Sequence, residues 1–311
     1  LVATRSFGST SSKPWDVLNQ AGCELVKADM SQKMTEERLI ELLQGVDGAI
    51  IGVVPMTAHV LENAPALKVV SMHGVGVDHI DLTAAARRGV VIANCLGTND
   101  QSVADLTIGL MISIARNIPS VDSKLRHGGW GAHAGNELWK KTIGLVGLGR
   151  IGRGVAKRAL GFDMQVLAYD PYVKFGDVEQ GISLVSFDEV LKEADYISLH
   201  AALSEETRHM IGAAQLKIMK PTAYLINTAR GALVDEAALY NALAQKQIAG
   251  AALDVFNEEP PKDSSLLQLE NLVITPHIGA HTRESIERMG VMAAENVLRT
   301  LQGGQPYHRV A

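Results

Sequence analysis

The sequence contains very little cysteine. Only Cys23 and Cys95 occur among 311 residues, and their spacing fits neither a metal site nor a redox pair. We therefore expect no disulfide framework and no metal centre, and a reducing cytoplasm is the default location. Low-complexity runs and obvious internal repeats are also absent.

Long apolar segments and an excess of positive charge are missing too. The longest apolar helical stretch, 106–115, is too short for a bilayer, which takes about 20 apolar residues. Lysine and arginine total 29 against 34 acidic residues, a net charge of −5. We therefore expect neither a membrane span nor a nucleic-acid partner. The opening LVATRSFG is typical of a strand and not of a signal peptide, and without an initiator Met we expect a few residues to precede it.

Residues 142–170, TIGLVGLGRIGRGVAKRALGFDMQVLAYD, form a dinucleotide-binding pattern. An apolar run suited to a buried strand leads into Gly147, Gly149 and Gly152, then into a helical pattern, a second apolar run and Asp170. Glycines punctuate many loops, so a purely structural turn is the alternative. The strand, helix and acid in this order favour a dinucleotide site.

Each part of this pattern has an expected task. Gly147 allows a tight turn, Gly149 lets the backbone approach a pyrophosphate, and Gly152 lets the helix lie close to the strand. The helix N-terminus, with Arg150 and Ile151, offers N–H groups to the phosphates. Asp170 would accept hydrogen bonds from ribose hydroxyls and repel a 2′-phosphate, which favours NAD over NADP.

Strand and helix patterns alternate along most of the chain. Strands are expected at 1–4, 49–53, 69–72, 90–93, 142–147, 165–169, 196–200, 223–227, 249–254 and 272–275. Helices are expected at 13–21, 35–43, 57–63, 81–88, 102–116, 151–161, 187–193, 213–219, 235–245 and 284–301. This alternation predicts an α/β protein with two doubly wound parallel sheets.

The last helix is too short to form a domain alone, so we expect it to return to the first domain. That predicts a discontinuous flavodoxin-like domain, 1–98 plus 282–311, with a Rossmann NAD domain, 99–281, inserted into it. Helix 102–116 is apolar nearly all round and should therefore be buried between two bodies, either two domains or two subunits.

Three ionisable residues stand at or just past expected strand ends: Arg230, Glu259 and His277. Each has an ordinary alternative. His277 could cap a strand end, Arg230 could form an interdomain salt bridge, and Glu259 has Glu258 beside it in a proline-rich turn. Taken together and in order, they favour a catalytic group.

Five segments resemble the D-2-hydroxyacid dehydrogenases, which include 3-phosphoglycerate dehydrogenases and glyoxylate/hydroxypyruvate reductases. In order they read GVGVDHID, GLGRIG, NTARGALVDE, ALDVFNEEP and TPHIGAHT. The resemblance implies that Arg230, Glu259 and His277 are the catalytic residues and that the first domain binds substrate, with the N–H groups of Val75 and Gly76 cradling its carboxylate.

Position and resemblance together imply further NAD contacts at His200, Ala201, Thr228, Asp254, Gly279 and Thr107. Asp254 would meet the nicotinamide carboxamide. Thr107 has a common alternative, because a hydroxyl inside a helix often bonds its own backbone.

The expected chemistry follows from the residue types. A histidine of near-neutral pKa can give a proton to a carbonyl oxygen and retrieve it in the reverse reaction. A neighbouring carboxylate orients the imidazole and raises its pKa, while an arginine grips a substrate carboxylate in a forked pair. The sequence thus predicts interconversion of a small D-2-hydroxy acid and its 2-oxo acid.

The substrate pocket departs from the family pattern. Phosphoglycerate-type members carry an arginine where this chain reads Met72-His73, which argues against phosphoglycerate. His73, expected at the substrate, and Arg5 could meet a different distal group, although both could equally be ordinary surface residues. His281 stands where a small residue is common. The chain ends at Ala311, so we expect no regulatory domain with a serine-feedback site.

The overall prediction is an NAD-dependent homodimer with helix 102–116 at the dimer contact. One alternative is a related enzyme acting on another small anion, such as formate or phosphonate; formate-type enzymes use a different acid/base pair. The other is an NAD-sensing, corepressor-like binding protein, although such proteins usually carry tails for partner motifs.

Overall fold

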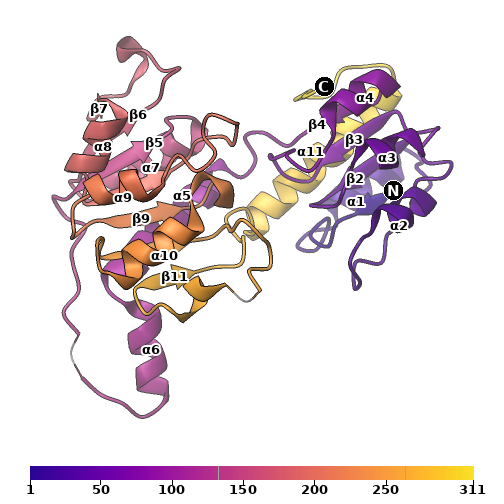
Figure 1. The fold of residues 1–311 in the computed structure, drawn as a ribbon. Coiled ribbons are helices and arrows are strands. Elements are labelled where there is room, and N and C mark those ends of the chain that lie inside the picture. Colours follow the sequence, from indigo (N-terminus) through magenta and orange to yellow (C-terminus); the bar gives the residue numbers. More distant parts are fainter. Residues whose placement is uncertain (132, 263) are drawn as a thin grey trace. The chain divides into compact units, whose positions relative to one another are not determined.

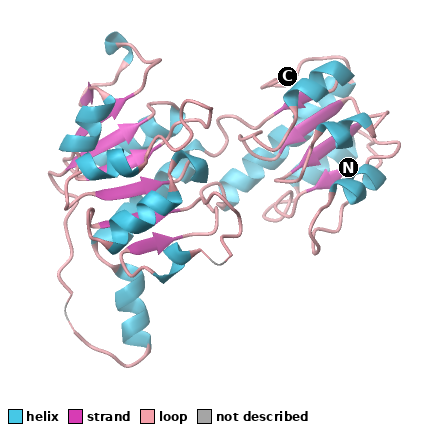
Figure 2. Ribbon diagram, viewed as in Figure 1, coloured by secondary structure: helices cyan, strands magenta, loops and turns pink. Residues whose placement is uncertain are grey.

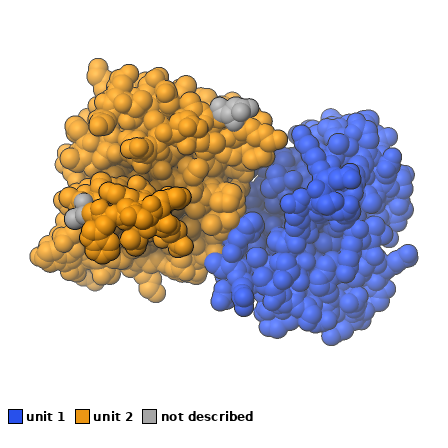
Figure 3. All heavy atoms as spheres, turned by 90° about the horizontal axis from the view of Figure 1, so that it is seen from below, with its two compact units in different colours: residues 1–99, 280–311 blue, residues 100–279 orange. Residues whose placement is uncertain are grey.

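The computed structural model describes residues 1–131, 133–262 and 264–311. The chain divides into two compact units (Figure 3): unit 1 comprises Leu1–Asn99 and Ala280–Ala311, and unit 2 comprises Asp100–Gly279. Unit 2 is thus an insertion in unit 1. The boundaries expected from the sequence, 98/99 and 281/282, differ from these by one and two residues.

Unit 1 is built on a four-stranded sheet of order β1-β2-β3-β4, with every pair parallel. Its strands are β1 (Val2–Ala3), β2 (Gly48–Ile51), β3 (Val69–Met72) and β4 (Val91–Ala93). Successive residues of β2 point to opposite faces: Ala49 and Ile51 join one apolar cluster and Ile50 joins the other. The strands read as continuous apolar runs because helices cover both faces.

Five helices cover this sheet: α1 (Lys13–Gln20), α2 (Glu36–Leu42), α3 (Ala58–Glu62), α4 (Leu82–Arg88) and α11 (Arg283–Leu301). Thr35, Thr57, Asp81 and Thr282 cap four of them by accepting a backbone N–H, which satisfies a donor of the first turn. Helix α11 packs against α1, β2 and β3, and so ties the end of the chain to its first hundred residues.

Unit 2 is built on a seven-stranded parallel sheet of order β11-β10-β9-β8-β5-β6-β7 (Figures 1 and 2). Its strands are β5 (Thr142–Val146), β6 (Gln165–Tyr169), β7 (Ile182–Leu184), β8 (Tyr196–Leu199), β9 (Tyr224–Asn227), β10 (Gly250–Leu253) and β11 (Leu272–Ile274). The strand order reverses between β5 and β8, where sheets of this kind form their ligand crevice.

The helices of unit 2 are α5 (Asp100–Ala115), α6 (Ile118–Arg126), α7 (Arg150–Leu160), α8 (Phe187–Glu193), α9 (Ala213–Ile218) and α10 (Glu236–Ala244). Short 3-10 turns occupy Phe175–Asp177, Gly231–Leu233 and Ser265–Gln268. The predicted class, α/β with two doubly wound parallel sheets, is confirmed. Among the described residues, none of the helices has both the length and the apolar character needed to cross a bilayer.

Helix α5 is only partly covered by its own unit. It packs within unit 2, against α7 on one side and strands β9, β10 and β11 on the other. Gln101, Asp105 and Gly109 remain exposed along it. The expectation that a second body covers this helix therefore stays a prediction.

Two glycines provide a matched test of this packing. A Cβ added to Gly144 in β5 would lie 2.6 Å from Cγ1 of Val190 and 2.9 Å from Cβ of Ala194, both on or beside α8. Gly144→Ala should therefore destabilise the protein by about 1–3 kcal/mol through overpacking. Gly109 in α5 has no atom within 4 Å of such a Cβ in the described structure, so Gly109→Ala should stabilise by about 0.5–1 kcal/mol.

Urea unfolding followed by circular dichroism measures both changes. Equal shifts of the two midpoints in the same direction would contradict the described packing of α8 on β5.

Candidate active site

The glycine-rich turn after β5 depends on two close backbone approaches. Gly147 has a φ of +99°, and a Cβ on it would lie 2.7 Å from the carbonyl carbon of His200. A Cβ on Gly152 would lie 2.2 Å from the carbonyl oxygen of Gly147. Only glycine fits at both positions. Gly149 differs, because no described atom lies within 4 Å of an added Cβ there, which leaves open space over the turn.

The open side of this turn fits a pyrophosphate. Gly149 is the N-cap of α7 and provides no side-chain cap, so the first N–H groups of the helix remain as donors for an anion. The Arg150 side chain is 61% exposed there, and Ile151 is half-buried. The N-terminus of α7 thus offers N–H donors and the Arg150 guanidinium to a dinucleotide phosphate.

Asp170 follows β6 and is tied to the same turn. Its Oδ2 accepts the N–H of Leu148 at 2.8 Å, and its Oδ1 accepts the N–H of Tyr172 at 2.9 Å. The side chain is half-buried beside the glycine-rich turn. This is the position that a ribose-binding carboxylate needs.

His200 and Ala201 follow β8, the strand beside β5. The His200 N–H donates to the carbonyl of Val146 at 2.7 Å, and its Nε2 lies 2.9 Å from Oγ of Ser198. Burial lowers the pKa of His200 to about 4, so the imidazole is neutral at physiological pH. Cδ2 of its ring would lie 3.8 Å from a Cβ on Gly152, so the ring packs beside the glycine-rich turn. Ala201 is half-buried.

Thr107 and Thr228 meet inside unit 2. The Thr107 hydroxyl donates to the carbonyl of Val103 in its own helix at 2.8 Å and lies 3.0 Å from the Thr228 hydroxyl. Both residues are buried. The hydrogen bond to its own helix backbone, which was the alternative for Thr107, is thus present. The contact with Thr228 also joins α5 to the end of β9.

Asp254, directly after β10, is hydrogen-bonded to the turn after β11. Its carboxylate accepts the hydroxyl of Thr275 at 2.6 Å and the N–H groups of Ile278 and Gly279, both at 2.8 Å. The residue is only 1% exposed. Asp254 therefore holds the turn after β11 in place, a role that the sequence did not indicate.

Arg230, Glu259 and His277 follow three adjacent strands. Asn227, Leu253 and Ile274 are aligned across β9, β10 and β11, and each is the last residue of its strand. Because parallel strands end at the same edge of a sheet, the segments that follow them are neighbours. The structure thus brings the three residues to one edge of unit 2.

The Arg230 turn is shaped by two residues that the sequence did not single out. Asn227 accepts the N–H of Ala229 at 3.0 Å and donates to the carbonyl of Arg230 at 2.8 Å. A Cβ on Gly231 would lie 2.0 Å from the carbonyl carbon of Phe256, so only glycine lets this turn rest on the segment after β10. Both Asn227 and Gly231 belong to the NTARG motif, which could have indicated them. The contact of Gly231 with Phe256 could not be predicted, because Phe256 is distant in sequence.

His277 and Glu259 form a direct pair. Nδ1 of His277 lies 2.7 Å from Oε2 of Glu259, and Oε1 of Glu259 accepts the N–H of Phe256 at 3.1 Å. His277 has a φ of +52° and donates its backbone N–H to the carbonyl of Asp254 at 2.8 Å. The two side chains are 43% and 36% exposed, so this pair is accessible from solvent.

The pair's charges are mutually stabilised. The hydrogen bond that His277 donates to Glu259 raises the pKa of His277 above its usual value. Burial and Arg230 oppose this rise, and the charges of Glu259 and Asp254 add to it. Burial alone would raise the pKa of Glu259, but His277, the Phe256 N–H and Arg230 bring that pKa below its usual value. An imidazolium beside a carboxylate is therefore favoured.

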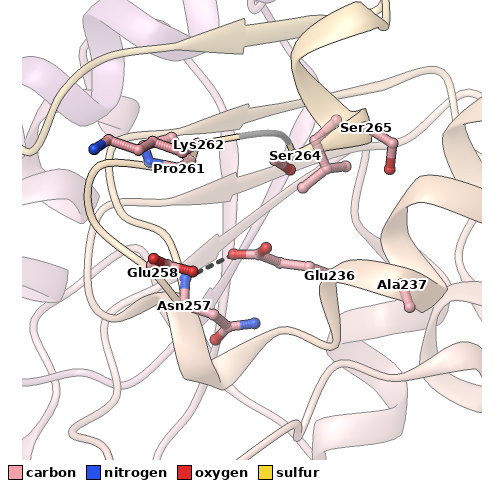
Figure 4. Close-up of a pocket in the computed structure, with 9 residues that line it drawn as sticks. Glu236, Ala237, Asn257, Glu258, Pro261, Lys262, Ser264 and Ser265 are labelled. Atoms are coloured by element: carbon pink, nitrogen blue, oxygen red, sulfur yellow. Dashed lines mark hydrogen bonds between the residues drawn. The ribbon is translucent and has the colours of Figure 1, made fainter.

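The neighbouring acid, Glu258, has a different environment. It lines a separate pocket of about 410 Å³ near the start of α10 (Figure 4), where the N–H of Asn257 donates to Oε1 of Glu236 at 2.7 Å. Neither Glu259 nor His277 lines this pocket. Of the two adjacent acids, Glu259 is therefore the one paired with His277.

The candidate substrate residues of unit 1 follow β3. Val75 and Gly76 are half-buried, and the carbonyl of Val75 accepts the side-chain amide of Asn94 at 2.9 Å. In the described part of the chain, the backbone N–H groups of Val75 and Gly76 have no hydrogen-bond acceptor. They are therefore available to an anion.

His73 is not a surface residue, so that alternative is wrong for it. It is 6% exposed, its Nδ1 lies 3.1 Å from Oγ of Ser6, and burial lowers its pKa to about 4. Arg5 is exposed and donates from Nε to the carbonyl of Met30 at 2.7 Å. His281 is also exposed. Across the described residues, no group of three or more His, Cys, Asp or Glu side chains could hold a metal ion.

Comparison with known proteins places these features in a family. The NAD-binding domain of the D-isomer specific 2-hydroxyacid dehydrogenases matches residues 108–279. The chain is 44% identical over 285 residues to a D-3-phosphoglycerate dehydrogenase of Methanocaldococcus jannaschii, covering 90% of this chain but only 54% of that protein. It therefore spans about half the length of that relative.

Two further matches extend over nearly whole proteins. A glyoxylate reductase of Thermococcus litoralis is 43% identical over 279 residues, 86% of this chain and 84% of that protein. A crystal structure of D-lactate dehydrogenase from Aquifex aeolicus, complexed with NAD and lactic acid, superposes with a TM-score of 0.84 at 30% identity, covering 97% and 96% of the two chains. The chain therefore belongs to the D-isomer specific 2-hydroxyacid dehydrogenases, a family of NAD-dependent enzymes.

Proposed function

We propose that this chain interconverts a small D-2-hydroxy acid and its 2-oxo acid, with His277 as the proton donor and acceptor. The observation that carries this proposal is the 2.7 Å contact between His277 and Glu259 at the carboxyl edge of a dinucleotide-binding sheet. NAD, when bound, accepts a hydride from the hydroxy acid, and its reduced form returns one to the 2-oxo acid.

The protein's own residues move the proton and hold the substrate. Nδ1 of His277 is engaged by Glu259, which leaves Nε2 to give a proton to the carbonyl oxygen or to take one from the hydroxyl. Glu259 fixes the ring orientation and stabilises the protonated form. Arg230 binds the substrate carboxylate and polarises the carbonyl, and the free N–H groups of Val75 and Gly76 bind the same carboxylate.

The cofactor contacts follow from the geometry of unit 2. Gly147, Gly149, Gly152, Arg150 and Ile151 would surround the pyrophosphate. Asp170 would bind the ribose, and Ala201 and Thr228 would border the cofactor. Four further residues form hydrogen bonds within the protein: His200, Thr107, Asp254 and Gly279. These bonds support positioning roles in addition to the contacts expected from the sequence.

The substrate is a small 2-oxo acid of the glyoxylate or hydroxypyruvate type. Met72 and His73 provide no cation where a phosphoglycerate would need one, and His73 is neutral and buried. Rates of NADH oxidation with a panel of 2-oxo acids, including glyoxylate, hydroxypyruvate and sulfonated or phosphorylated analogues, would identify it. The relatives from Methanocaldococcus jannaschii and Thermococcus litoralis are a dehydrogenase and a reductase, which does not favour the binding-protein alternative.

The assembly that we propose is a homodimer. Its contact surface includes the exposed side of α5, where Asp105 and Gly109 lie, as expected from the sequence. Helix α6, none of whose residues is buried, and Trp130, which is 89% exposed, extend this surface. The cytoplasmic location stays a prediction.

Removal of the imidazole should abolish most of the activity. His277→Ala should lower kcat by about 10²–10⁴-fold, the usual contribution of a general acid or base, and leave NADH binding unchanged. His209→Ala is a matched control, since His209 is exposed in unit 2 with the same φ of +52°. A near-normal kcat for His277→Ala, measured by NADH oxidation, would show that the proton comes from another group.

The pH dependence tests Glu259. Reduction needs protonated His277, so its rate should fall as pH rises through the pKa of that residue. Glu259→Gln removes the main cause of the raised pKa, so the alkaline limb of kcat/KM should move to lower pH. Glu258→Gln should leave it in place. If both variants kept the wild-type profile, Glu259 would have no part in proton transfer.

Cofactor choice tests Asp170. Asp170→Ser should weaken NADH binding about tenfold or more while affecting NADPH less, because charged hydrogen bonds to the ribose are lost together with the repulsion of a 2′-phosphate. Asp170→Asn keeps an acceptor for the Leu148 N–H and should shift the preference in the same direction. Fluorescence titration would give the dissociation constants for NADH and NADPH. If their ratio were unchanged in both variants, Asp170 would not be the ribose-binding residue.

A further inference from the structure

We propose that unit 1 contains a second anion-binding site, separate from the substrate cradle, between the segment after β1 and residues 27–31. It is a pocket of about 340 Å³ lined by Thr4, Arg5, Trp15, Lys27, Met30 and Ser31, among others. Its ligand is a small molecule that carries a phosphate or carboxylate group. The pocket lies wholly within unit 1, and this inference does not depend on the proposed reaction.

The fold places the pocket at the carboxyl edge of the sheet. Val2 donates its N–H to the carbonyl of Val26 at 2.8 Å, and Ala28 donates to the carbonyl of Val2 at 2.9 Å. Val2 and Lys27 are thereby bridged in a parallel sense. Two chain segments therefore leave the sheet in the same direction, and the crevice beyond such ends is the usual place for a ligand.

Two cations face this pocket in defined positions. Arg5 donates from Nε to the carbonyl of Met30 at 2.7 Å, and its Nη2 donates to the same oxygen, which orients the guanidinium. Nζ of Lys27 lies 4.0 Å from the centroid of the Trp15 ring. Trp15 is itself braced edge-on by Phe7 at 4.7 Å and 85°. The cations are thus held by a carbonyl and an aromatic face, and neither is neutralised by those partners.

The lining contains no carboxylate among the described residues. The nearest acid in sequence, Asp29, lies outside this lining. It accepts the N–H of Ser31 at 2.9 Å and lies 3.8 Å from the guanidinium of Arg38, and the charge of Arg5 acts on it as well, less than that of Arg38. Hydroxyls of Thr4 and Ser31 add donors. Positive charge, hydroxyl donors and an aromatic wall are the combination that binds an oxyanion attached to a small organic body.

The pocket is too far from the substrate cradle to be part of it. Strand β2 separates β1 from β3, and neighbouring strands lie about 4.8 Å apart, so the ends of β1 and β3 are about 10 Å apart. Glyoxylate bound at Val75 and Gly76 cannot span that distance. The ligand is therefore either a separate molecule or the distal acid group of a longer 2-oxo acid.

The three tryptophans of the chain allow a direct test. We would label the whole protein with 5-fluorotryptophan, assign the Trp15 resonance with Trp15→Phe, and titrate inorganic phosphate or malonate at constant ionic strength. The Trp15 signal should shift saturably, while those of Trp130 and Trp139 serve as internal references. Arg5→Gln and Lys27→Met should each weaken this binding about tenfold or more, since each removes one charged partner.

Lys68→Met is the matched control, because Lys68 is an exposed cation of unit 1 engaged with Asp47. It should leave the phosphate affinity unchanged. The proposal is overturned if the Trp15 shift does not saturate, or if the affinity is the same in Arg5→Gln, Lys27→Met and wild type. These titrations measure binding and require no turnover. Their result can therefore be interpreted even if the proposed reaction is wrong.

Kinetics then identify the source of the anion. Phosphate at saturating levels should leave the KM for glyoxylate unchanged; a rise in that KM parallel to the Trp15 shift would place phosphate in the substrate cradle and overturn the second site. If phosphate competes with 2-oxoglutarate, and Arg5→Gln removes that competition, the site takes the substrate's distal group. If no 2-oxo acid competes, the ligand is a separate molecule.

Discussion

A buried carboxylate links the end of β10 to the turn that carries His277. Asp254 is almost completely buried, and leaving such a charge without partners would cost several kcal/mol. The hydroxyl of Thr275 and the N–H groups of Ile278 and Gly279 supply those partners. The same hydrogen bonds fix the backbone on both sides of His277, so the position of the imidazole is a consequence of satisfying Asp254.

Close contacts between backbones set the positions of the other groups in a similar way. Gly152 rests on the carbonyl of Gly147, and Gly231 rests on the carbonyl of Phe256. The first contact shapes the glycine-rich turn after β5, and the second brings the Arg230 turn against the segment that leads to Glu259. A side chain at either position would push the two backbones in contact there apart.

Most of the regular structure could be predicted because its cause is local. Buried parallel strands are apolar runs, and the N-cap at Thr35 is a property of one turn. Strand β7 was missed because it is only three residues long and partly exposed, and α6 because none of its residues is buried. Neither element leaves the apolar pattern on which such a prediction rests.

The residues of the candidate site could be predicted from the sequence, but their hydrogen-bond partners could not. The order of Arg230, Glu259 and His277 along the chain is visible in the sequence, but the partner of each is not. Asp254 was expected to face the cofactor and in fact accepts three hydrogen bonds from the turn after β11. His73 was given a surface alternative, yet it is buried beside Ser6, 67 residues away in the chain. Such contacts depend on tertiary packing, which no local pattern records.

The electrostatics of the trio show why an acid is needed beside the histidine. In the proposed reaction Arg230 holds the substrate carboxylate, but its charge lowers the pKa of His277. Partial burial lowers that pKa as well. Without a compensating anion, these two effects would bring the pKa of His277 below its usual value. Glu259 offsets both effects through a hydrogen bond at 2.7 Å, and Asp254 adds to it from behind. Glu259 thus allows Arg230 and an imidazole of raised pKa to lie at the same edge of the sheet.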